Sequence, residues 1–240
     1  MASLGLLFAG FSIVLPLVLF GLLVVVVVGV STARNEPDPH NHRLPATYLT
    51  AVSFVLVFTA LFGLTAAVAS VSSLIGEEDS FSVTAEPDFG DDFEPRSETP
   101  LTPVDDSDVE DATAGALAGA FVVVVAGGML WHHRRTLLGL LDAEGFRGGA
   151  GARVVHAYLY ATQFVAVLVL VGAGAVTLYG LAQVLVPGLL SDGEAQSVRE
   201  GGARLFLTAG ALAGGAGLVA AVHLREHERV DRSAPPPPVV

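Results

Sequence analysis

The chain has 240 residues, of which 52% are hydrophobic and only 15% are charged. Soluble domains usually carry about 25% charged residues, so this composition is typical of a membrane protein. The sequence contains no cysteine, which excludes disulfides, thiolate metal sites and cysteine nucleophiles.

The formal net charge of −12 comes from one segment. Residues 76–112 hold 14 acidic residues and one basic residue, Arg96, whereas the rest of the chain holds 10 acidic residues and 11 arginines. All 12 basic residues are arginine, and this composition resembles that of proteins from salt-loving archaea. Acidic surfaces stay hydrated where salt screens charge. We interpret 76–112 as an acidic, solvated loop that cannot bury enough apolar surface to fold alone.

Long apolar runs recur along the chain. The first, Leu4 to Val30, is long enough to cross a bilayer, and no basic segment precedes it, which argues against a cleaved signal peptide. Four more runs lie at about 45–75, 113–131, 154–186 and 203–224, and none has a charged residue in its middle. The sequence therefore predicts an all-α, polytopic bundle of about five transmembrane helices.

Arginine placement predicts the orientation of this bundle, because cytoplasmic loops collect basic residues. Nine arginines lie in the three segments that follow the first, third and fifth runs, whereas Arg96, Arg199 and Arg204 lie in the alternate segments. We expect a multi-pass protein of the cell membrane, with its N-terminus outside and its C-terminus in the cytoplasm. The acidic loop is then extracellular.

Two parts of the chain are similar to each other, which indicates an internal duplication. The set Arg43, Tyr48, Leu49, Ala51, Phe54 and Val55 matches Arg153, Tyr158, Leu159, Ala161, Phe164 and Val165 at constant spacing. The hexapeptide 114–119 recurs as 209–214, and His132 and Arg134 align with His223 and Arg225 or, one turn later, with His227 and Arg229. Both units would run in the same direction, as parallel repeats.

This duplication predicts the domain organisation. An N-terminal transmembrane helix, 1–33, precedes a first two-helix unit, 43–135, which contains the acidic loop. A cytoplasmic linker, 136–152, leads to a second two-helix unit, 153–229, and four consecutive prolines predict that the tail 230–240 is disordered. The architecture is one added helix plus two tandem hairpins.

The segment from Tyr158-Leu159-Tyr160 to His223-Leu224-Arg225 resembles a prokaryotic membrane domain family of unknown function. The pattern of that family opens with a Tyr-Leu-Tyr helix and often closes with Trp-His-x-Arg. Trp131-His132-His133-Arg134 fits the closing motif, whereas Val222 replaces the tryptophan in the second copy and Tyr48-Leu49-Thr50 departs from the opening motif. The resemblance covers roughly residues 43–229, and it implies a four-helix membrane unit without an established activity.

Candidate site residues fall into three groups. His132, His156 and His223 could converge into a metal or haem site, although their positions at helix ends favour interfacial anchoring, so we expect no cofactor. Arg134, Arg135, Arg225 and Arg229 are candidates for binding lipid headgroups. Gly115 and Gly119, like Gly210 and Gly214, have the spacing that lets membrane helices approach closely, and the two glycine faces could meet at the centre of the bundle.

Three functions remain open from the sequence. The first is a non-enzymatic accessory, scaffold or sensor subunit, since the spans lack the buried charges that transport coupling needs. The second is a small transporter or channel subunit, with Gln163 and Thr177 on its pathway. The third is a membrane redox protein with haem or metal at the inner face. The expected partners are the lipid bilayer and a membrane protein or a second copy of the chain, and no nucleic acid.

Overall fold

The computed structural model describes residues 2–35, 38, 41–75, 106–141, 146, 149–187 and 195–232. In this part of the chain five helices follow one another: α1 (Ala2–Asn35), α2 (Arg43–Ser72), α3 (Asp106–Leu141), α4 (Ala150–Leu185) and α6 (Ala195–Arg232). Most of the acidic loop and of the proline-rich tail lies outside the described residues. The prediction of an all-α bundle is confirmed.

Several helices are longer than their apolar runs. The third helix begins at Asp106, within the segment interpreted as a loop, and ends at Leu141, within the expected linker. The fifth begins at Ala195, eight residues before its apolar run. Hydropathy locates the part of a helix that crosses the membrane, but backbone hydrogen bonding can continue beyond it until a breaker intervenes. Acidic residues such as Asp106 and Asp108 are also favourable at a helix N-terminus.

Four of the helices are long and apolar enough to cross a membrane: Arg43–Ser72, Val109–Leu141, Ala150–Leu185 and Ala195–Glu228. In α1, whose side chains are described from Leu15 to Ser31, that stretch is apolar as well. Large hydrophobic side chains also lie on the outside of the bundle, among them Leu117, Phe121 and Val124 of α3 and Leu178 of α4. In lipid such side chains need no protein cover. The protein is a helical membrane bundle.

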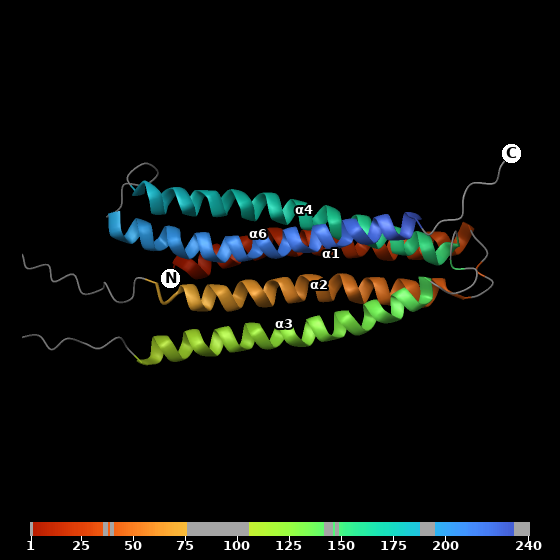
Figure 1. Cartoon of the computed structure of the whole chain (residues 1–240), viewed down its shortest axis with the longest axis horizontal. Coiled ribbons are helices and arrows are strands. Elements are labelled where there is room, and N and C mark those ends of the chain that lie inside the picture. The colour runs from red at the N-terminus through yellow and green to blue at the C-terminus, as the bar shows by residue number, and fades with distance from the viewer. Residues whose placement is uncertain are drawn as a thin grey trace, which may run out of the picture.

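Successive helices run in opposite directions along the long axis of the bundle, so the start of α1 and the end of α6 lie at opposite ends (Figure 1). The second helix packs along α3, and α4 packs along α6, so the bundle contains two antiparallel hairpins. The first helix lies against α4 and α2, and α6 also packs on α2. We call the end where α2 and α4 begin the Tyr158 end and the opposite end, where α2 finishes, the Ile75 end.

The core lies between α1, α2 and α4. Phe54 and Phe58 are almost completely buried, with ring centroids 5.0 Å apart. Val25 of α1 and Val165 of α4 are fully buried as well. The glycine at position 21 of α1 makes room for this packing, since a Cβ there would lie 2.4 Å from the Phe54 ring.

Glycines bring the helices of both hairpins into close approach. A Cβ on Gly119 of α3 would lie 2.6 Å from the carbonyl oxygen of Gly63 on α2, and one on Gly115 would lie 2.4 Å from the Ser70 hydroxyl. Between α4 and α6, a Cβ on Gly180 would lie 2.8 Å from the carbonyl oxygen of Gly202. At Gly119 and Gly180 the backbones of neighbouring helices therefore meet directly, as in other membrane helix pairs.

The second predicted glycine pair behaves differently. A Cβ on Gly210 would make only an ordinary 3.6 Å contact with Thr177 of α4, and one on Gly214 would meet nothing within 4 Å. The expectation that the two glycine faces meet at the bundle centre is not met, because α3 turns its glycines toward α2 and α6 packs along α4 and α2. Spacing identifies a small-residue face, but it does not identify the neighbouring helix.

Candidate functional site: a polar cluster at the Tyr158 end

A buried hydrogen bond joins α4 to α6 at the Tyr158 end. The Tyr158 hydroxyl lies 2.9 Å from Nε2 of His223, and both side chains are about 5% exposed. The other ring nitrogen, Nδ1, lies 2.9 Å from the Val219 carbonyl oxygen. A carbonyl can only accept, so Nδ1 carries a proton; in the neutral imidazole Nε2 then accepts from the tyrosine hydroxyl. Both ring nitrogens of His223 therefore have a partner.

An ion pair lies next to this hydrogen bond and joins α3 to α6. Nη2 of Arg134 lies 2.5 Å from Oε1 of Glu226, and the glutamate side chain is only 17% exposed. Glu226 follows His223 by three residues, which places both on one face of α6. The two charges are close enough to Tyr158 and His223 to interact with them electrostatically. The four side chains form one unit, which we call the polar cluster.

Further aromatic and histidine rings lie at the Tyr158 end of the bundle. The ring centroid of His227 lies 4.6 Å from that of Tyr160 and 5.5 Å from that of His156. On the α2–α3 side, the Tyr48 and His133 centroids are 6.1 Å apart. Such amphipathic rings are enriched where a membrane helix meets water, so their position marks the Tyr158 end as an interface.

The three candidate histidines take three different environments. His223 is buried in the polar cluster, His156 contacts the His227 ring, and His132 is exposed beside His133, with centroids 5.8 Å apart. Within the residues that the structure describes, no three histidine, aspartate or glutamate side chains are grouped so that they could hold a metal ion. The structure does not bring the three together into the site that the sequence suggested.

The candidate headgroup arginines are also divided. Arg134 is occupied by Glu226, whereas Arg135 and Arg225 are exposed. Arg229 lies in α6, but its side chain is outside the described ones.

Sequence reasoning missed the role of Glu226 and the pairing of Tyr158. The available signal was weak: the duplication identified Tyr158 and His223 as corresponding to earlier residues, but not as partners of each other.

Comparisons with protein-family models, with curated proteins and with solved structures find no match to this chain. The class of the protein is therefore stated from the fold, which is that of a multi-pass helical membrane protein.

The polar cluster joins α3, α4 and α6 to one another. Polar groups in a membrane helix bundle are costly unless they bond one another, and here a hydrogen bond and an ion pair join groups from three helices. Some hydroxyls elsewhere in the spans bond to their own helix: Thr65 donates to Leu61 and Thr177 donates to Ala173. The interhelical contacts hold the helices in place.

Proposed function

We propose that the protein is a non-catalytic component of the cell membrane, an accessory, scaffold or sensor subunit. The observation that carries this proposal is the polar cluster, in which Tyr158 bonds His223 and Arg134 pairs with Glu226. A transport pathway would instead present unbonded polar groups to a water-filled cavity. Gln163 and Thr177 line neither the groove between α2, α3 and α6 at the Ile75 end nor the groove between α1 and α4 at Tyr160 and Phe164.

The redox alternative receives less support from the same residues. Ligation of haem or metal by His223 would require Nε2 to leave Tyr158, since Nδ1 is bonded to the backbone. His156 and His227 have ring centroids 5.5 Å apart and are in edge contact, an arrangement that leaves no room for a haem between them.

The test of the proposal uses the purified full chain, reconstituted in vesicles. We expect no solute flux above that of protein-free vesicles and no Soret absorption. Flux or turnover by the protein alone would overturn the proposal.

A photo-crosslinking amino acid at Phe121 of α3 or at Leu178 of α4, which are 69% and 68% exposed, should capture a protein partner in native membranes from one of these two faces. Lipid adducts alone from both positions would contradict a subunit role.

We also propose that the Tyr158 end faces the cytoplasm. Arg43, Arg134, Arg153 and Arg225 all lie toward this end, whereas Arg199 and Arg204 lie toward the Ile75 end. The excess of arginine on one side supports the orientation through the preference of basic residues for cytoplasmic loops.

Cysteine labelling can test this orientation, because the natural chain has no cysteine. Gln196→Cys, at the start of α6, should react with a membrane-impermeant maleimide added to intact cells. Gly149→Cys, just before α4, should react only after the membrane is permeabilised. The reverse pattern would show that the protein has the opposite topology.

The proposed duplication gains support from the two hairpins. In each, a tyrosine of the first helix lies beside a histidine of the second: Tyr48 with His133, and Tyr158 with His223. In each, Nδ1 of that histidine bonds a carbonyl four residues back, at 2.8 Å to Met129 and at 2.9 Å to Val219. This correspondence pairs His133 with His223, which is one residue from the earlier of the two alignments and matches neither of them. It also puts the matching hexapeptides, 114–119 and 209–214, five residues out of register with this pairing.

A further inference from the structure

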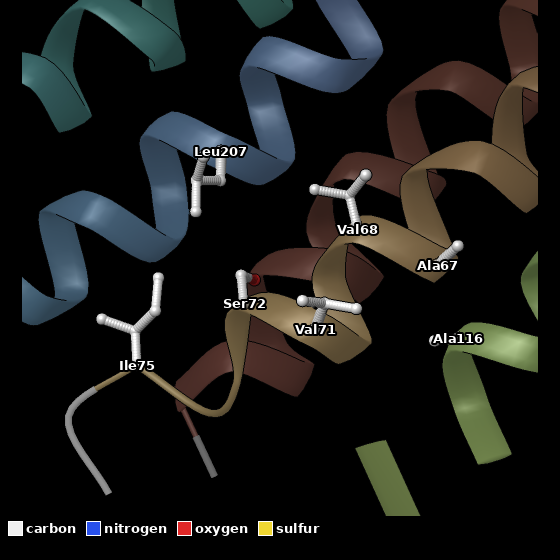
Figure 2. A pocket seen from close by; sticks show the side chains of 7 residues that line it. All are labelled: Ala67, Val68, Val71, Ser72, Ile75, Ala116 and Leu207. Atoms are coloured by element: carbon white, nitrogen blue, oxygen red, sulfur yellow. The ribbon is translucent and has the colours of Figure 1, made fainter. Parts of the chain in front are cut away.

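A groove on the outside of the bundle lies at the Ile75 end, where α2 is flanked by α3 and α6. Its volume is about 380 Å³, and it is lined by Ala67, Val68, Val71, Ser72, Ile75, Ala116 and Leu207. Figure 2 shows the α2 side chains between Leu207 on α6 and Ala116 on α3. Val71 and Leu207 remain 57% and 41% exposed, so the groove opens toward the membrane rather than into the core.

The groove has a direction along α2. The lining residue nearest the middle of the bundle is Ala67, and the one nearest its end is Ile75, which lies in the turn just after α2. Eight residues at about 1.5 Å each give a length of about 12 Å. The trough therefore starts where α2 reaches the membrane surface and runs along the helix toward the middle of the bilayer.

Polar groups lie only at the surface end of this trough. Arg204 of α6 donates to the Ile75 carbonyl oxygen from Nε, at 2.8 Å, and from Nη2. These two bonds use two of the five N–H donors of a guanidinium. Beside it, the hydroxyls of Ser72 and Thr208 are 3.1 Å apart. The half-buried guanidinium of Arg204 is thus held at the surface end of the apolar groove by its bonds to the Ile75 carbonyl, and its other N–H donors remain available.

We propose that this groove binds one anionic phospholipid, with an acyl chain along α2 and the phosphate at Arg204. The ligand class follows from charge and polarity: a positive charge at the surface end and apolar lining toward the bilayer centre match a molecule with a negative head and an apolar tail. The orientation is also the one that lipids of that leaflet already have. Arginine suits a phosphate because its planar fork makes paired, charge-assisted hydrogen bonds.

Native mass spectrometry of the full chain, titrated with dioleoyl phosphatidylglycerol, tests the proposal. Dioleoyl phosphatidylcholine, which has the same tails and a zwitterionic head, is the reference lipid. We expect one tight site that prefers the anionic lipid. Arg204→Gln should weaken phosphatidylglycerol binding about tenfold, the scale of losing charge-assisted hydrogen bonds, and should remove the preference. Arg199→Gln, which changes an exposed arginine one turn away on the same helix, should leave the affinity unchanged.

A second variant addresses the trough without touching the arginine. Ala116→Leu fills the groove from the α3 side and should weaken binding of both lipids, whereas Ala118→Leu, on an exposed part of α3 outside the groove, should not. Thermal unfolding of each variant shows whether the bundle has stayed intact. Binding of both lipids with equal affinity to all five proteins would mean that only the general lipid belt is detected, and it would overturn the proposal. Absence of a tight site in the natural chain would overturn it too.

Discussion

Replacing Gly119 with alanine is expected to destabilise the bundle by about 3 kcal/mol, the upper range for overpacking. The added methyl would lie 2.6 Å from the Gly63 carbonyl oxygen and 2.7 Å from the Ala67 backbone nitrogen. Both atoms belong to the backbone of α2, so no side chain can rotate away to relieve the contact. The two helix axes must separate, and the contacts along the α2–α3 hairpin weaken together.

Gly128→Ala is the matched control, because it makes the same chemical change on the same helix. A Cβ at Gly128 meets nothing within 4 Å, so this variant should be neutral or more stable by up to about 1 kcal/mol through helix propensity. Unfolding of both variants in detergent micelles, followed by circular dichroism, gives the comparison. Equal stability of the two variants would show that α2 and α3 do not meet at Gly63 and Gly119.

Removing the histidine of the polar cluster should have the second largest effect. His223→Leu leaves the Tyr158 hydroxyl without its partner in a site that is 5% exposed, at a cost of about 2 kcal/mol. Tyr158→Phe leaves Nε2 of His223 unpartnered and should cost about 1 kcal/mol. In the double variant neither unpaired group remains, so the two effects should not add. The expected coupling is about 1 kcal/mol, within the range found for hydrogen bonds between membrane helices.

The corresponding pair in the first hairpin supplies the control. Tyr48 is 61% exposed, and its ring lies 6.1 Å from that of His133, so Tyr48→Phe should change the unfolding free energy by less than about 0.5 kcal/mol. The measurement is a double-mutant cycle in micelles for each pair. A coupling energy near zero for Tyr158 and His223 would show that their hydrogen bond does not fasten α4 to α6.

The apolar runs were sufficient to predict the helical bundle, the order of its helices and their approximate centres. They could not predict that α3 extends from Asp106 to Leu141, since the ends of this helix carry polar residues and hydropathy reports only the membrane-crossing part. Among the glycines, Gly115 and Gly119 were found through their spacing of four. Gly63, Gly180 and Gly202 were missed, because each becomes important only through the helix that lies against it.

In the candidate site, too, the sequence indicated where residues lie along the helices but not which residues they contact. The sequence located the histidines and arginines at helix ends, whereas α3 and α6 continue for nine residues beyond His132 and His223. It could not pair Arg134 with Glu226 or Tyr158 with His223, because each pair depends on how two helices are rotated about their axes. Arg134 was accordingly interpreted as a headgroup ligand, whereas in the folded chain its charge is directed to α6.

The ion pair between Arg134 and Glu226 also has a mechanical meaning for α3. In the part of the chain that the structure describes, α3 packs mainly along α2, and the two backbones come into close contact where Gly119 lies against Gly63. Arg134 lies fifteen residues beyond Gly119, about 22 Å further along the helix. Because the ion pair lies far from the glycine contact, even a modest bond there opposes tilting of α3. The angle of α3 in the bundle is thus held at two points, by the glycine contact within the membrane and by the ion pair near its surface.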